Sequence, residues 1–310
     1  MNLDMKTTIA KIIFFLIIII ALFSTMNSPT ALLLGFVFAI IFRSPFKSKS
    51  YKAIHILLKV AVVGLGFGML IKETLATSKQ AFSLTFFSIF LTVGLGLILT
   101  KTLKLDKKLG HLITSGTAIC GGSAIAAISP VIKANSKTIS VALGIVFLLN
   151  SVALFLFPTI GHFLHLSQEQ FGLWCAIAIH DTSSVVGTAL SYGDEALRIA
   201  TTVKLSRTLW IIPLAILSMF IFKTKGEKIS IPYFILLFIL AIIINSYHLI
   251  PTEITSEIVF YSKRVLVVTL FLVGTTISIK DLKSTGIKPI VLALSLWGFI
   301  SIFSLIYITY

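Results

Sequence analysis

The sequence has few charged residues and few of the side chains that build redox or metal sites. Only 12% of its 310 residues are Asp, Glu, Lys or Arg, whereas a soluble domain of this length would need a more highly charged surface. Its two cysteines, Cys120 and Cys175, both lie in apolar runs, so a disulfide framework is not expected. The Cys and His residues do not follow the spacing of a metal site, and we expect neither a metal nor another bound cofactor.

The sequence also lacks the motifs of common catalytic folds. Ser123 and His180 could be imagined as a hydrolase pair, but no nucleophile motif surrounds Ser123. Walker and dinucleotide-binding motifs are missing as well. We therefore expect no enzymatic activity and assign no catalytic residue.

The sequence is rich in long apolar runs. Hydrophobic residues make up 57% of the chain, and the mean hydropathy is +1.05. Apolar runs recur throughout, many near the ~20 residues that cross a bilayer as a helix. This pattern predicts an all-α polytopic membrane protein with about eleven transmembrane helices, at residues 8–24, 29–43, 53–71, 80–100, 110–132, 138–163, 168–191, 197–222, 230–248, 256–278 and 287–308.

We expect residues 1–310 to form a single transmembrane domain. Its first 28 or so residues resemble a signal peptide, with Lys6 and Lys11 before an apolar stretch. Because further apolar runs follow directly, an uncleaved extra first helix is the better interpretation.

The distribution of Lys and Arg predicts the orientation of the chain. The net charge of +15 does not indicate a nucleic-acid partner, because the basic residues lie in short loops between apolar runs. With eleven crossings, one side receives sixteen Lys and Arg, and the other receives only Lys72, Lys79, Lys133, Lys137 and Arg198. The rich side is the cytoplasm, which places the N-terminus inside and the C-terminus outside. One misfit is the loop 164–168, which falls on the rich side yet contains no Lys or Arg.

The first polar feature within the apolar chain is the segment 115–127. It contains three glycines together with Ser115, Thr117, Cys120 and Ser123. The pair Gly121-Gly122 should interrupt a helix, and a helix restarting there would direct free N–H groups into the protein. We therefore predict an anion or substrate site formed by Thr117, Cys120, Gly121, Gly122 and Ser123, with Ser123 as N-cap. The alternative is a small-residue face for close helix packing.

The second polar feature is His180-Asp181-Thr182-Ser183-Ser184. Ionisable residues are costly in a bilayer and indicate a functional site. We expect His180 and Asp181 to couple transport to protons or Na⁺, and Ser183 and Ser184 to contact substrate. The alternative is a buried ion pair that only fixes helix positions.

The third polar feature is a basic face in the run 197–222. Lys204 shares a helical face with two threonines and is flanked by Arg207. We predict that one of these cations partners Asp181 and that the other faces an anionic substrate, which Arg would bind in bidentate fashion. The alternative is that both side chains reach the membrane interface.

Two weak internal matches suggest repeats. A shift of 208 residues aligns Gly66 and 71–73 with Gly274 and 279–281, as an inverted repeat would. A shift of 60 residues aligns 119–123 with 179–183, in parallel orientation. One duplication cannot produce both matches. Either one match is accidental, or one element is re-entrant and the span count is wrong.

The chain resembles the sulfate exporter family, the YeiH-type proteins of bacterial inner membranes. The matching segments are 116–127, 180–187, 204–213 and 263–274. Members often have Gln at the position of Ser184 and Ala at that of Gly122. The resemblance implies the fold of NhaA-type antiporters and bile acid:sodium symporters, with two inverted repeats (roughly 29–165 and 166–310), a panel and a core. It also implies two discontinuous helices, the run 110–132 and either 168–191 or the run containing Gly274-Thr275-Thr276.

Together these features predict a secondary active transporter of a small inorganic or organic anion, working by alternating access in the bacterial inner membrane. The resemblance implies sulfate or an organosulfonate as substrate and export as direction. A cation/proton antiporter using Asp181 and a non-transporting structural or sensory membrane protein are the alternatives. The oligomeric state stays open, with a homodimer as one option.

Overall fold

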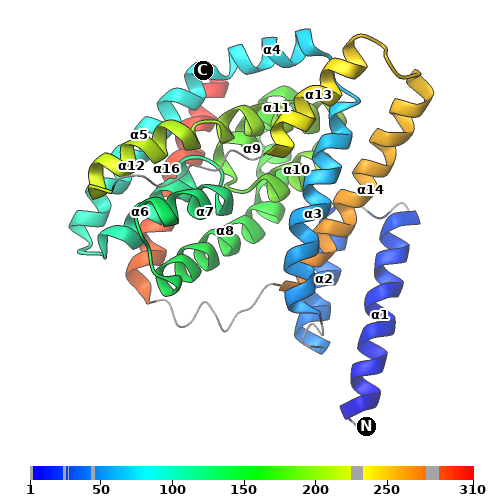
Figure 1. Cartoon of the computed structure of the whole chain (residues 1–310), viewed down its shortest axis with the longest axis horizontal. Coiled ribbons are helices and arrows are strands. Elements are labelled where there is room, and N and C mark those ends of the chain that lie inside the picture. The colour runs from blue at the N-terminus through cyan, green and yellow to red at the C-terminus, as the bar shows by residue number, and fades with distance from the viewer. Residues whose placement is uncertain (1–2, 24–25, 27, 43–45, 225–232, 277–285) are drawn as a thin grey trace. The chain divides into compact units, whose positions relative to one another are not determined.

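A computed structural model of the chain describes residues 3–23, 26, 28–42, 46–224, 233–276 and 286–310, and helix dominates these residues (Figure 1). The helices are α1 (Leu3–Phe23), α2 (Ser28–Phe42), α3 (Lys47–Gly66), α4 (Ile71–Gln80), α5 (Phe82–Thr102), α6 (Lys107–Ala118), α7 (Gly122–Val131), α8 (Ser136–Phe163), α9 (Gln168–Ala178), α10 (Thr182–Tyr192), α11 (Asp194–Thr208), α12 (Ile211–Phe222), α13 (Tyr233–Ser246), α14 (Thr252–Thr276) and α16 (Ile287–Thr309). No strand occurs among the described residues, so the predicted all-α class is confirmed for them.

Five helices in the described part of the chain are long and apolar enough to cross a membrane. They are Phe82–Thr102, Lys137–Phe163, Asp194–Phe222, Thr252–Thr276 and Ile287–Thr309. A sixth is added if Lys52–Gly66 and Ile71–Gln80, which meet at 110°, count as one span. The other predicted runs correspond to shorter apolar helices or to interrupted helix pairs, so the count of eleven crossings stays a prediction.

The chain divides into two compact units, each assembled from separate stretches of sequence. Unit 1 comprises residues 1–74, 186–191 and 232–277, and unit 2 comprises 75–185, 192–231 and 278–310. In unit 1, α14 packs against α2 and α3. Phe14 of α1 contacts Phe271 of α14, with ring centroids 5.4 Å apart and the rings tilted by 53°, in a core of buried apolar side chains.

The candidate break at Gly274-Thr275-Thr276 lies at the last turn of α14, which runs without interruption from Thr252. The segment 279–281 of the 208-residue match lies outside the described residues. Of the two candidates for the second discontinuous helix, the run 168–191 is interrupted between α9 and α10, whereas the described part of the run 256–278 is continuous.

Unit 2 is built from α5–α9, α11, α12, α16 and the start of α10. Its largest apolar cluster joins buried side chains of α5, α6, α7, α8, α12 and α16. The α5–α6 contact is reciprocal: a Cβ added at Gly96 would lie 2.2 Å from the Thr114 hydroxyl oxygen, and one added at Gly110 would lie 2.3 Å from the Thr100 hydroxyl oxygen. Each threonine thus occupies the space over the opposing glycine, which lets the two backbones approach closely.

Polar side chains at helix starts fix where the unit 2 helices begin. Asp106 accepts a hydrogen bond from the Leu109 amide before α6, and Asn135 accepts one from the Thr138 amide before α8. Ser167 forms a capping box with Gln170 at the start of α9. These caps satisfy amide groups that the helices leave free.

The run 110–132 folds back on itself. Its two halves, α6 and α7, form a pair that we call hairpin 1, Lys107–Val131 (Figure 1). The Lys108 ammonium donates to the Lys133 carbonyl oxygen at 2.7 Å, so the two ends of the hairpin meet. A straight helix would separate these residues by roughly 37 Å. The reversal occurs at Gly121, whose φ of 61° and ψ of −121° suit glycine alone.

The run 168–191 folds back in the same way. We call the pair α9 and α10 hairpin 2, Gln168–Tyr192. The Tyr192 hydroxyl donates to the Leu166 carbonyl oxygen at 2.7 Å, and the Phe171 and Tyr192 rings stack with centroids 3.7 Å apart. The backbone therefore reverses at 119–121 and again at 179–181, within two of the runs that were predicted as spans.

The reciprocal α5–α6 contact predicts a position-specific effect of Gly→Ala substitution. Gly96→Ala should destabilise the protein by about 1–3 kcal/mol, because the new methyl group overlaps Thr114. Gly94→Ala on the same helix should be neutral or stabilising, because a Cβ added there meets nothing within 4 Å. Thermal unfolding in detergent measures both variants, and equal melting temperatures would contradict the packing described.

Candidate functional site

The tips of the two hairpins touch inside unit 2. A Cβ added at Gly121 would lie 3.2 Å from the Asp181 nitrogen and 3.3 Å from the His180 carbonyl carbon. We call this contact, formed by 118–122 and 178–182, the tip junction. Four helix ends converge there: the C-termini of α6 and α9 and the N-termini of α7 and α10. Converging ends expose backbone groups that need partners in an apolar interior.

The carbonyl groups at the end of α9 are satisfied by side chains of α11 and α16. Lys204 donates to the Ala176 and Ile179 oxygens at 3.2 and 2.7 Å. Arg207 donates to the Ile177 oxygen at 3.0 Å, and the Trp297 indole donates to the Ala178 oxygen at 3.1 Å. Every carbonyl from 176 to 179 thus has a donor.

The same two cations satisfy the end of α6. Arg207 donates twice to the Ala118 oxygen, from Nε at 3.0 Å and from Nη2. Lys204 donates to the Ile119 oxygen at 3.1 Å, and the Gly121 amide donates to the Gly116 oxygen at 2.8 Å. Each cation therefore bridges both hairpins, and their positive charges face the negative ends of two helix dipoles.

A carboxylate holds the N-terminus of α10. Asp181 accepts hydrogen bonds from the Ser184 amide and hydroxyl, from the Ser183 hydroxyl and from the Asn150 side-chain amide. Asn150 lies midway along α8, and its side-chain oxygen accepts from the His180 amide at 3.1 Å. Asp181 is thus an N-cap whose carboxylate is itself fully engaged.

The N-terminus of α7 is different. Its N-cap residue is Gly121, and no side chain caps it. In the 60-residue match Gly121 aligns with Asp181, so α7 lacks the carboxylate that α10 has at the equivalent position. One positive helix end at the tip junction therefore has no protein anion.

The structure brings most of the predicted site residues to the tip junction. Cys120, Gly121, His180 and Asp181 lie in the two tips, and Gly122, Ser183 and Ser184 lie in the first turns that follow. Ser123 is exposed on the first turn of α7. The Thr117 hydroxyl and both ring nitrogens of His180 are buried and have no hydrogen-bond partner among the described residues.

The positions of the two cations differ from the prediction. We expected one to pair with Asp181 and the other to face a substrate, but both are fully buried and bind backbone carbonyls. The physical reason is that two helix ends inside the apolar interior require donors. The alternative that both side chains extend to the membrane interface is excluded by the same contacts.

Two residues of other helices, Asn150 and Trp297, contact the tip junction. Asn150 connects α8 to hairpin 2, because its amide contacts both Asp181 and the His180 backbone. In the sequence, the only sign of this role is a polar amide in the middle of an otherwise apolar stretch. Trp297 was not predicted, because a tryptophan in an apolar run usually serves as packing.

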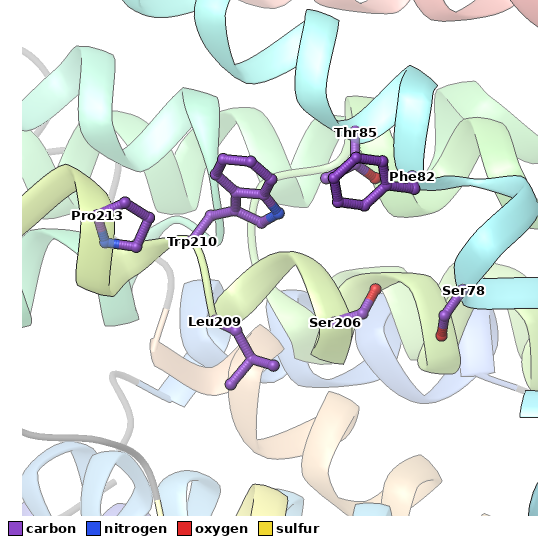
Figure 2. Close-up of a pocket in the computed structure, with 7 residues that line it drawn as sticks. All are labelled: Ser78, Phe82, Thr85, Ser206, Leu209, Trp210 and Pro213. Atoms are coloured by element: carbon purple, nitrogen blue, oxygen red, sulfur yellow. The ribbon is translucent and has the colours of Figure 1, made fainter. Parts of the chain in front are cut away.

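A pocket of about 360 Å³ lies beside the connection between α11 and α12 (Figure 2). It is lined by Ser78, Phe82, Thr85, Ser206, Leu209, Trp210 and Pro213. None of the predicted site residues lines it, and its walls are mostly apolar. It is therefore distinct from the tip junction.

Comparison with known proteins gives a consistent set of relatives. The family described as "Conserved hypothetical protein 698" matches residues 7–293. A protein of Photobacterium profundum named "UPF0324 membrane protein" is 52% identical over 96% of this chain and 91% of its own length. Relatives with the same description in Bacteroides thetaiotaomicron and Shewanella oneidensis are 48% and 46% identical, over 90% and 97% of this chain and 86% and 95% of their own lengths. No solved structure matches the chain.

The bridging role of Arg207 predicts a large loss of stability on its removal. Arg207→Met leaves the Ala118 and Ile177 carbonyl groups buried without donors and should cost at least about 3 kcal/mol. Arg207→Lys should be intermediate, because it keeps the charge but loses the fork geometry. Thermal unfolding of the purified protein measures both effects.

Arg198→Met is the matched control on the same helix. Arg198 is half-buried and lies 3.9 Å from Glu195, so this variant should change stability by less than about 1 kcal/mol. Wild-type stability of Arg207→Met would contradict the proposed bridging role.

Proposed function

Because the chain belongs to the family described as "Conserved hypothetical protein 698", whose relatives are named as membrane proteins, we propose that it is a secondary active transporter of a small anion. It is a multi-pass membrane protein, and we place it in the bacterial inner membrane with a cytoplasmic N-terminus. In this proposal it works by alternating access, without enzymatic chemistry. Sulfate or an organosulfonate as substrate, and export as direction, rest on the resemblance stated above.

The observation that carries the proposal is the asymmetry of the two N-termini at the tip junction. Asp181 caps α10, whereas α7 begins at Gly121 with no side-chain cap. A helix N-terminus offers free amide groups and a positive dipole end. In the proposed complex, an acidic group of the substrate takes at α7 the place that the Asp181 carboxylate takes at α10.

The formal charges around the tip junction support an anion as ligand. Lys204 and Arg207 contribute two positive charges and Asp181 one negative charge, which leaves a net charge of +1. Because the cations are engaged with carbonyl groups, they act on the substrate through the electrostatic field and do not need to touch it. The roles proposed for Thr117, Cys120 and Gly122 are to line the anion site.

Asp181 and His180 are the groups we propose for ion coupling. Asp181 lies beside the Ser183 and Ser184 hydroxyl groups, and hydroxyl and carboxylate oxygens are groups that also bind hard cations. His180 is buried at the tip junction with both ring nitrogens unpartnered among the described residues. A proton or Na⁺ arriving here would change the charge next to the anion site.

The same environment of Asp181 favours one alternative, a cation/proton antiporter. That function predicts a Na⁺-driven pH change in vesicles that contain no anion substrate. A structural or sensory membrane protein predicts neither transport nor an anion-dependent change in melting temperature. A thermal-shift screen of small anions on detergent-purified protein separates these functions.

Placing a carboxylate at the α7 N-terminus should block anion binding. Ser123→Asp adds a negative charge to the first turn of α7 at an exposed position, where it should interact favourably with the helix end. We expect the variant to melt at or above the wild-type temperature, while sulfate- or methanesulfonate-dependent stabilisation and uptake into proteoliposomes fall at least about tenfold.

Ser123→Asn is the matched control for size and polarity. It should retain anion-dependent stabilisation, because it adds no charge. Equal anion binding by the Asp and Asn variants would place the anion elsewhere.

Asp181→Asn should separate coupling from folding. Asn is as good an N-cap as Asp, so the start of α10 should stay intact. The loss of the carboxylate should make anion uptake insensitive to imposed proton and Na⁺ gradients. Uptake measured with and without each gradient tests this, and an unchanged gradient response would remove Asp181 from the coupling mechanism.

A further inference from the structure

The two hairpins begin at opposite ends of unit 2. Hairpin 1 starts and finishes at the end where Lys108 contacts Lys133. The 28-residue helix α8 then leads away from that end, over about 42 Å, to the start of hairpin 2. Hairpin 2 starts and finishes at this second end, where Tyr192 contacts Leu166. Both hairpins therefore point inward, and their tips meet between the two ends.

The arms of both hairpins have the length of half a bilayer. They contain 12 and 10 residues in hairpin 1 and 11 and 11 residues in hairpin 2. At 1.5 Å per residue each arm covers about 15–18 Å, against about 30 Å for the hydrocarbon core. Irregular backbone at such a depth is tolerated where protein satisfies its polar groups, as Lys204, Arg207 and Trp297 do here.

We infer that hairpins 1 and 2 are re-entrant and enter the membrane from opposite sides. Nine of the eleven apolar runs then cross the bilayer, and the tip junction lies near its midplane. Because two crossings are removed, the number of crossings stays odd, and both termini stay on the sides predicted from the sequence. Only the loops 132–138 and 164–168 exchange sides.

The distribution of basic residues along the sequence supports this inference independently of the hairpin contacts. The exchange moves Lys133 and Lys137 to the rich side, which changes sixteen against five into eighteen against three. It also moves the loop 164–168, which has no Lys or Arg, to the poor side. The misfit left by eleven crossings disappears, as the positive-inside rule requires.

The re-entrant arrangement assigns a separate barrier to each side of the membrane. Hairpin 1 lies between the tip junction and the side that carries Lys108 and Lys133. Hairpin 2 lies between the tip junction and the side that carries Leu166 and Tyr192. A solute at the tip junction is therefore reached past hairpin 1 from the cytoplasm and past hairpin 2 from outside.

Cysteine accessibility tests the inference without any knowledge of the substrate. In a background with Cys120 and Cys175 replaced by Ala, Lys137→Cys and Leu164→Cys report on the two loops that change sides. Lys104→Cys and Glu195→Cys serve as references, because both schemes place them on the cytoplasmic and external sides, respectively. A membrane-impermeant maleimide is applied to right-side-out and inside-out vesicles.

We expect Lys137→Cys to label with Lys104→Cys, and Leu164→Cys with Glu195→Cys, each at least fivefold faster from one side. The reverse pattern, or a change of side at only one of the two loops, would overturn the inference. Lys133→Cys and His165→Cys provide a second pair of exposed positions if a first variant fails to fold. Loss of anion transport alone would not alter the labelling pattern, so the topology and the proposed function can fail separately.

Discussion

The fold of unit 2 is possible only because buried carbonyl groups find hydrogen-bond donors. Reversing two helices inside an apolar interior exposes the C-terminal carbonyls of α6 and α9, and each unsatisfied group would cost about 1–3 kcal/mol. Two cations on one helix, Lys204 and Arg207, meet this need for both hairpins at once. These contacts satisfy the buried carbonyl groups on both sides of the tip junction and hold the two hairpin tips to α11.

The sequence was most informative where a polar residue interrupts an apolar run. Gly121-Gly122 and His180-Asp181 marked both tips, because helix-weakening or ionisable residues at such positions need a physical reason. The fold-back itself could not be read from hydropathy, since an apolar run has the same composition whether it crosses or returns. The misplaced Lys133 and Lys137 and the uncharged loop 164–168 were the available signal.

The role of the two cations shows a second limit of sequence reasoning. We predicted that these cations bind Asp181 and an anionic substrate, but a row of backbone carbonyl groups attracts the same side chains. In the structure, Lys204 and Arg207 face carbonyl groups. The proposed function therefore places the anion at the free end of α7, which no side-chain pattern marks directly.

The bridging contacts also bear on how the protein can move. Hairpin 1 is held to α11 by three hydrogen bonds from charged donors, two from Arg207 and one from Lys204. At about 1.5 kcal/mol or more each, displacing hairpin 1 alone costs roughly 4–5 kcal/mol or more. Such a displaced state would be populated in fewer than about one molecule in a thousand at equilibrium. Any conformational change of unit 2 should therefore move α11 and both hairpin tips together as one rigid body, held by the hydrogen bonds of Lys204 and Arg207.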